Sequence, residues 1–210
     1  MQRSAIRTEV RRILNDLNTV LFTDAMINSW IDLGVVDAGT YLELDTAVAT
    51  ISTVTSEQNY QLPSNAMSIK DAYLQDQADR QTRLKVVSQD ELNDLYGNQW
   101  REEPAGAPIA LFQADYNVVG LYPATNAANA SNTLRVFYVR IPSNLASDTD
   151  TPIFMDALHD AVSWYCASRG YALLGNPDKS DWALKRYQAL LSKFMSIATR
   201  FSDDMRRFRW

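Results

Sequence analysis

The spacing of apolar residues changes twice along this chain, and that change constrains the fold more than any single motif. Up to about residue 45, apolar side chains recur every three to four positions, which predicts helices. From about Thr46 to residue 147, segments such as AVATISTVTS alternate and are rich in β-branched residues, which predicts strands. Helical spacing then returns. We therefore expect an α+β fold in which a β-rich segment separates two pairs of helices.

Two helices are expected within residues 1–45. The first begins at about Ser4, and its apolar face continues as far as Leu17. Thr23 is typical of an N-cap, and it precedes a second helix with an apolar surface, around Trp30 and Val35, broad enough to need neighbours on two sides. On another face of the first helix an arginine recurs every fourth residue: Arg3, Arg7 and Arg11. Such a stripe is typical of a solvated helix face, and alternatively contacts an acidic partner.

Two more helices are expected within residues 148–201. Thr151 is placed to cap the first of them, Pro152 suits its first turn, and Gly175 follows its end. Asp178 then begins a partner helix. We expect both pairs of helices to form one four-helix bundle, with residues 46–147 as an inserted antiparallel β subdomain and residues 202–210 as a C-terminal docking tail.

A short helix is also expected inside the β-rich segment. In SQDELNDLYG, Ser88 and Glu91 have the spacing of a capping box, and Gly97 lies just past the end of the helical pattern. This helix is expected to interrupt the order of strands without forming a domain of its own.

The charge and the cysteine content exclude some classes of protein. The chain has 20 Lys and Arg against 25 Asp and Glu, a formal charge of -5, so its surface as a whole should repel a phosphate backbone. Its one cysteine, Cys166, cannot pair within the chain, which favours a reducing compartment. The opening residues carry charges where a signal peptide is apolar, and no apolar run is long enough for a membrane span. We therefore expect a protein that is soluble and intracellular when made, not a general nucleic-acid binder or a membrane protein.

Residue types that carry chemistry are sparse. His159 is the only histidine, and it lies about 10 Å along a helix from Cys166, too far for proton transfer. Asp148, Asp150 and Asp156 lack the spacing of a calcium loop and are better explained as residues that cap and solvate a helix start. The adjacent Glu102 and Glu103 are most simply a solvated pair. We expect no enzymatic activity, no cofactor and no metal.

Aromatic residues of the β-rich segment leave one binding function open. Trp100, Tyr116, Tyr122 and Tyr138 have the residue type of a carbohydrate-binding platform. Strand aromatics are more often half-buried cross-strand contacts, and we favour that interpretation. A carbohydrate-binding module remains an alternative.

The order of several phrases indicates a family. YQLPSNAMSI, VGLYP and FYVRIPSNL are followed by D-x-x-x-F-x-x-A-L-x-D-A-V and a paired terminal helix. In this order, over nearly the whole chain, the sequence resembles the head-to-tail adaptor proteins of tailed bacteriophages.

The resemblance implies a structural protein of the virion neck, made in the cytoplasm of the host bacterium. Such adaptors form a ring, typically a dodecamer, beneath the portal protein, and they offer a surface to a tail or nozzle protein. Their helices pack around the ring, their β elements project toward the tail, and genomic DNA passes through the central channel without sequence-specific binding. Another tail or baseplate component is the alternative within the structural proteins.

The last residues of the chain combine arginines with aromatic residues. Arginine and tryptophan are enriched at binding hot spots, and the resemblance implies that adaptor termini dock on the portal. We therefore expect the tail to dock on the portal, with folding back onto its own last helix as the alternative. The predicted partner-binding residues are Met205, Arg206, Arg207, Phe208, Arg209 and Trp210, together with Arg3, Arg7 and Arg11.

Overall fold

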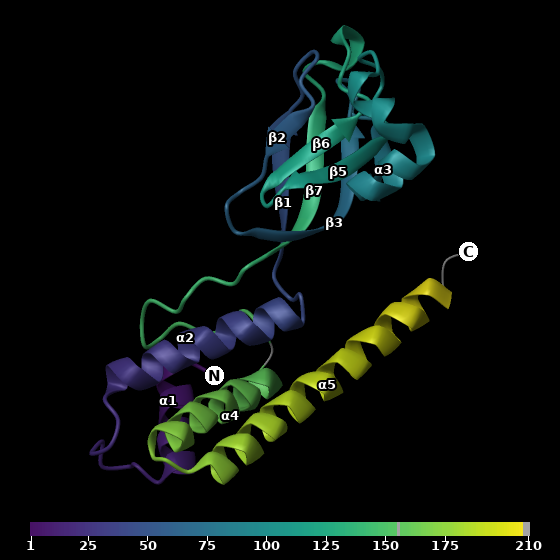
Figure 1. Ribbon diagram of the computed structural model, residues 1–210. Helices are drawn as coiled ribbons and strands as arrows, with labels where there is room; N and C mark the ends of the chain where they lie inside the picture. Colours follow the sequence, from purple (N-terminus) through teal and green to yellow (C-terminus); the bar gives the residue numbers. More distant parts are fainter. Residues whose placement is uncertain (155, 208–210) are drawn as a thin grey trace. The chain divides into compact units, whose positions relative to one another are not determined.

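The chain folds into two compact units, seen in a computed structural model (Figure 1). One unit joins Met1–Leu44 to Pro142–Trp210, and the other is Asp45–Ile141. The structure describes the backbone of residues 1–154 and 156–207, and all side chains in those ranges except those of residues 98, 157 and 197–207. The two units are called the helical unit and the β unit below, and each is described by itself.

The helical unit contains α1 (Arg3–Leu14), α2 (Asp24–Tyr41), α4 (Asp156–Leu173) and α5 (Pro177–Arg207). The predicted cap of α2 is confirmed, since the Thr23 side chain accepts a hydrogen bond from the backbone amide of Met26 at 3.3 Å. The predicted start of α4 at Thr151 is wrong. The carbonyl groups of Asp148 and Asp150 accept hydrogen bonds from the first backbone amides of α1, so the chain before α4 caps α1 and is not helical.

Helix α4 lies at the centre of the helical unit, packed against α1, α2 and α5. Its small residues allow this close approach: a side chain at Gly170 would meet Leu14 of α1, and one at Gly34 of α2 would meet Tyr165. Among the described side chains of α5, Ala183, Tyr187 and Leu191 are buried in the helical core, and Leu190 and Phe194 pack against it. The backbone of α5 continues to Arg207, past the first residue of α4 (Figure 1).

The predicted four-helix bundle with a small inserted subdomain is wrong. The described residues form five α-helices, because α3 (Gln89–Tyr96) belongs to the β unit, and α5, with 31 residues, is much longer than the 18-residue α4 against which it packs. A bundle needs helices that cover one another along a common core. Here α1, α2 and α5 each pack against α4, which supplies most of the shared surface.

The β unit contains one seven-stranded sheet in the order β1-β7-β3-β4-β5-β6-β2. Its strands are β1 (Thr46–Ser52), β2 (Asn59–Gln61), β3 (Ala66–Gln75), β4 (Gln81–Val87), β5 (Ala110–Asp115), β6 (Val118–Tyr122) and β7 (Thr133–Arg140). The predicted antiparallel sheet is wrong at one pair, because β4 and β5 run parallel. Helix α3 and the 3₁₀-helix η1 (Gly97–Glu102) form the connection that a parallel pair requires.

The sheet curls into a nearly closed barrel (Figure 1). All seven strands contribute residues to one buried cluster, which a flat sheet could not achieve. The two edge strands, β1 and β2, follow each other in the chain, and the Tyr60 hydroxyl accepts a hydrogen bond from the Val54 amide across the gap. A second cluster, formed by Leu92, Trp100, Phe112 and others, packs α3 and η1 on the outer face of β5 and β6. The β unit is therefore a domain with its own two cores.

Candidate functional site

The predicted C-terminal binding residues lie at the end of α5. The backbone of Met205, Arg206 and Arg207 is helical, their side chains lie outside the described residues, and Phe208 to Trp210 lie outside them altogether. From Leu191, which is buried in the helical core, to Arg207 the helix advances about 24 Å. Partner binding by these six residues stays a prediction.

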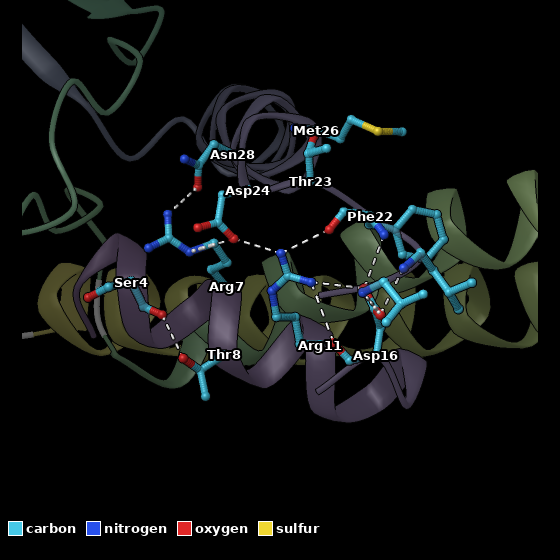
Figure 2. A network of polar contacts seen from close by, with 12 residues as sticks. Ser4, Arg7, Thr8, Arg11, Asp16, Phe22, Thr23, Asp24, Met26 and Asn28 are labelled. Carbon is cyan, nitrogen blue, oxygen red and sulfur yellow. Dashed lines mark hydrogen bonds and ion pairs between the residues drawn. The ribbon is translucent and has the colours of Figure 1, made fainter. Parts of the chain in front are cut away.

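The arginine stripe of α1 lies inside the helical unit, and Figure 2 shows Arg7 and Arg11 among the groups that they bind. Arg11 donates to the Asp16 carboxylate at 2.8 Å, to the Phe22 carbonyl at 2.9 Å and to the Asp24 carboxylate at 2.6 Å. Only 8% of its side chain is exposed. A guanidinium buried to this degree must be paired, because an isolated buried charge is costly.

The other two arginines of the stripe are engaged in the same way. Arg7 makes two hydrogen bonds to the Asp148 carboxylate, at 2.9 and 2.8 Å. Arg3 donates to the Leu145 carbonyl at 2.6 Å and to Asp32 at 3.0 Å. The expected solvated face is therefore wrong. Contact with a partner through these arginines stays a prediction, and the donors described here already bind acceptors within the unit.

Asp16 organises the loop between α1 and α2. Its two carboxylate oxygens accept hydrogen bonds from the backbone amides of Val20, Leu21 and Phe22, at 2.9, 3.0 and 3.1 Å. Burial alone would raise the pKa of Asp16, but these three amides and the charge of Arg11 outweigh burial, and the net pKa is lowered. The carboxylate is thus charged and fixes the loop from inside.

The same loop exposes apolar side chains. Leu17 is 65% exposed, Val20 79% and Leu21 52%. The prediction that Leu17 continues the buried face of the first helix is wrong, because α1 ends at Leu14 and Asn15 takes a left-handed conformation with φ 56°. An Asn-Asp pair after a helical run is a signal of such an end, and it could have been read from the sequence.

A second exposed pair lies at the same end of the helical unit. The Tyr171 hydroxyl donates to the Ile13 carbonyl at 2.9 Å, which places the end of α4 beside the end of α1. Leu173, the last residue of α4, and Leu174, which follows it, are 62% and 46% exposed. We call the five exposed residues together the end patch: Leu17, Val20, Leu21, Leu173 and Leu174. By contrast, Trp30 and Val35 are buried, and α2 packs against both α1 and α4, so the prediction that this surface needs neighbours on two sides is confirmed within the unit.

The residues considered for chemistry are buried or engaged in structural contacts. Burial, followed by the charge of the N-terminal amine, lowers the pKa of His159, and the Nδ1 atom lies 2.6 Å from that amine. Burial raises the pKa of Cys166. Asp150 accepts two backbone amides, and Asp156 accepts a hydrogen bond from the Met1 amine. Among the described residues no group of three or more His, Cys, Asp or Glu side chains could hold a metal ion.

Three of the four aromatics considered as a platform are buried in the β unit. Trp100, Tyr122 and Tyr138 are 3%, 2% and 5% exposed, and only Tyr116 is open to solvent. The Trp100 indole donates to the Asn93 side chain at 2.7 Å, and Tyr122 donates to the Glu103 carboxylate. Trp100 and Tyr122 pack α3 and η1 on the barrel, and Tyr138 lies in the barrel core, as the packing interpretation predicted. These three rings do not form an exposed platform.

Comparison with known proteins identifies the family. A family model described as SU10 adaptor protein matches residues 1–209. The chain belongs to the SU10 adaptor protein family. It is therefore a structural adaptor protein of a bacteriophage, which confirms the coarser part of the resemblance noted in the sequence. No curated protein matches the chain.

Membership of the family indicates what the exposed surfaces of this protein contact. A structural SU10 adaptor works through contacts with other phage head and tail proteins, and the family implies that it is not an enzyme. None of the described helices of this SU10 adaptor has both the length and the apolar content of a membrane span. Sequence reasoning missed the end patch, because it treated Leu17 as core and gave no role to Val20 and Leu21.

Proposed function

We propose that this SU10 adaptor is a head-to-tail adaptor of the virion neck. Copies of the chain form a ring, with twelve subunits as the expected number, between the portal protein and a tail or nozzle protein. Genomic DNA passes through the channel of this ring. The single observation that carries the proposal is the match of the SU10 adaptor family over residues 1–209.

Two features of the chain support an assembly of this kind. The end patch exposes five large apolar side chains on one end of a unit that already has a buried core, and such patches are typical of protein interaction surfaces. The loop that carries three of them is fixed by Asp16, so docking there orders few additional residues. In addition, a formal charge of -5 favours a channel wall that does not retain DNA.

The C-terminal segment, residues 205–210, is proposed to bind a partner within the neck. Arginines of this segment would meet carboxylate or carbonyl acceptors, while Phe208 and Trp210 would fill apolar clefts. Arg3, Arg7 and Arg11 have a different part in this proposal. They join α1 to α2 and to residues 145–150, so they stabilise the helical unit that carries the end patch. A partner that contacted these arginines directly would compete with the acceptors that they already bind.

Electron microscopy of the purified chain with its portal protein tests the function. A ring of adaptor density on the portal, absent from the portal alone, is the expected result. Binding of a tail protein by the chain without any portal would instead support the tail or baseplate alternative. A tight dimer of the isolated chain that buries the end patch and fails to bind the portal would contradict the proposal.

A further inference from the structure

We propose that a cleft beside η1 in the β unit binds the C-terminal segment of a second copy of the chain. The inference rests on the proposed assembly of copies, and it names the partner surface of residues 205–210. It replaces the portal, which the sequence alone suggested, with a site on the adaptor itself.

The η1 cleft combines aromatic walls with carboxylates. It has a volume of about 460 Å³ and is lined by Tyr96, Gln99, Trp100, Glu102 and Glu103. Tyr96 is 46% exposed, and the preceding Leu95 is 60% exposed, so apolar surface is available at its rim. Both side chains lie on the last turn of α3.

The walls of the η1 cleft are held in place before any ligand binds. The Trp100 ring packs edge-on against Phe112 and Tyr122, with ring centroids 5.0 and 6.0 Å away. The Tyr96 ring lies tilted by 47° against Tyr122, with ring centroids 4.8 Å apart, and Tyr122 in turn donates a hydrogen bond to Glu103. A binding surface that is already ordered loses little conformational entropy when it is occupied.

The charge of the surrounding surface favours a cationic occupant. Helix α3 and η1, with Glu103 next to them, carry five carboxylates: Asp90, Glu91, Asp94, Glu102 and Glu103. Lys85 neutralises Glu91, and Arg101, the one basic side chain of the segment, lies over the Trp100 ring at 4.8 Å. The remaining carboxylates outnumber Arg101, so an occupant that brings arginines and apolar side chains complements the surface.

The chain itself contains a segment of that chemistry. Residues 205–210, MRRFRW, place three arginines and two aromatic side chains within six positions, and no other six-residue stretch of the sequence does so. The segment is carried by α5, which advances about 24 Å from Leu191, a residue buried in the helical core, to Arg207. In an assembly of adjacent copies, such an extension brings the segment to a neighbour. Each exposed ion pair contributes little binding free energy, so we expect burial of Phe208 and Trp210 to provide most of the affinity.

Two full-length variants test this arrangement. One carries Phe208→Ala and Trp210→Ala, which disables the segment and leaves the cleft intact. The other carries Asp94→Lys and Glu102→Lys, which reverses charge at two exposed side chains near the cleft and leaves the segment intact. A control with Glu57→Lys and Asp181→Lys makes the same change in net charge at two exposed positions elsewhere.

Analytical ultracentrifugation of each variant and of their mixture gives the readout. The intact cleft of the first variant can bind the intact segment of the second, so the mixture should associate at least about tenfold more tightly than either variant alone. This association should weaken when salt is raised from about 0.05 M to about 0.5 M. The control should behave as the unmodified chain. A mixture that associates no better than either variant alone overturns the proposal. That result is expected if the C-terminal segment binds its own subunit or binds only the portal.

The outcome is separable from that of the proposed function. If the unmodified chain forms a ring on the portal while the two variants do not associate, the cleft assignment fails and the adaptor function stands. If the variants associate but the unmodified chain forms no ring on the portal, the adaptor function fails and the cleft assignment stands.

Discussion

Arg11 and Asp16 form a buried ion pair, with Nη1 and Oδ2 2.8 Å apart and side chains only 8% and 2% exposed. The pair connects the last turns of α1 to the loop that carries three residues of the end patch. Since Asp16 also binds three backbone amides of that loop, one carboxylate determines both the packing of an arginine and the shape of a candidate docking surface.

Replacing Asp16 tests this dependence. Asp16→Ala leaves the Arg11 charge buried and three amides without their acceptor, so the free energy of unfolding should fall by about 3 kcal/mol or more. Urea denaturation measures the change. Glu9→Ala is the matched control, because Glu9 pairs with the largely exposed Arg12, and its effect should stay below about 1 kcal/mol. Equal losses in both variants would contradict the structural role of Asp16.

Serine substitutions in the end patch should separate stability from assembly. Val20→Ser and Leu21→Ser change exposed side chains, so the unfolding free energy should move by no more than about 0.5 kcal/mol each. Ring formation on the portal should weaken clearly in the double variant. Val54→Ser, at an exposed valine of the β unit, serves as the control. Normal assembly of the double variant would exclude the end patch as a docking surface.

Gly170 should tolerate no side chain. A Cβ atom there would lie 2.6 Å from a Leu14 methyl group, because α1 and α4 approach closely at this point. Gly170→Ala should therefore lower the unfolding free energy by about 1–3 kcal/mol through overpacking. Ala172→Ser, at an exposed position of the same helix, provides the comparison in thermal denaturation. A neutral or stabilising Gly170→Ala would mean that the two helices can separate at little cost.

His159 should make stability depend on pH. Its pKa is lowered from 6.5 in the folded state, chiefly by burial, so the unfolded chain binds more protons between the two pKa values. The stability that neutral His159 contributes is therefore complete above about pH 6.5 and is lost as the pH falls below it. In His159→Gln this loss between about pH 7.5 and about pH 5 should be smaller than in the unmodified chain. Urea denaturation at both pH values measures the unfolding free energy. Equal losses in His159→Gln and in the unmodified chain would contradict this role of His159.

Removing the C-terminal segment should affect binding and not folding. Truncation after Asp204 keeps every residue of α5 that the structure describes as buried, so it should leave the melting temperature nearly unchanged. Binding to the partner in the neck should be severely weakened, and Trp210→Ala alone should cost about 2 kcal/mol, the usual threshold of a hot spot. If the segment folds back on its own helix, the melting temperature falls instead and binding per folded molecule stays constant. Both quantities are to be measured on the same truncated protein.

Local signals in the sequence predicted the order of elements and several of their ends. Thr23 and Ser88 accept the capping hydrogen bonds expected of them, and Gly97 follows α3 with a positive φ. These features depend on residues within one turn of each other, and the side-chain chemistry of that turn is sufficient to predict them. The phrases along the chain likewise indicated the family.

The environment of the arginine stripe was decided by tertiary structure. Arg7 binds Asp148 and Arg3 binds the Leu145 carbonyl, across more than 140 positions of sequence. The period of a helix indicates which face is apolar, but it does not say whether a distant segment will supply acceptors to the other face. The same limit applies to the parallel pairing of β4 with β5, which depends on the path of α3 and η1. The sequence by itself therefore determined which elements form and which surfaces are charged. Only the tertiary structure decided which charges are buried and which apolar residues stay exposed, because burial depends on contacts between residues far apart in the chain.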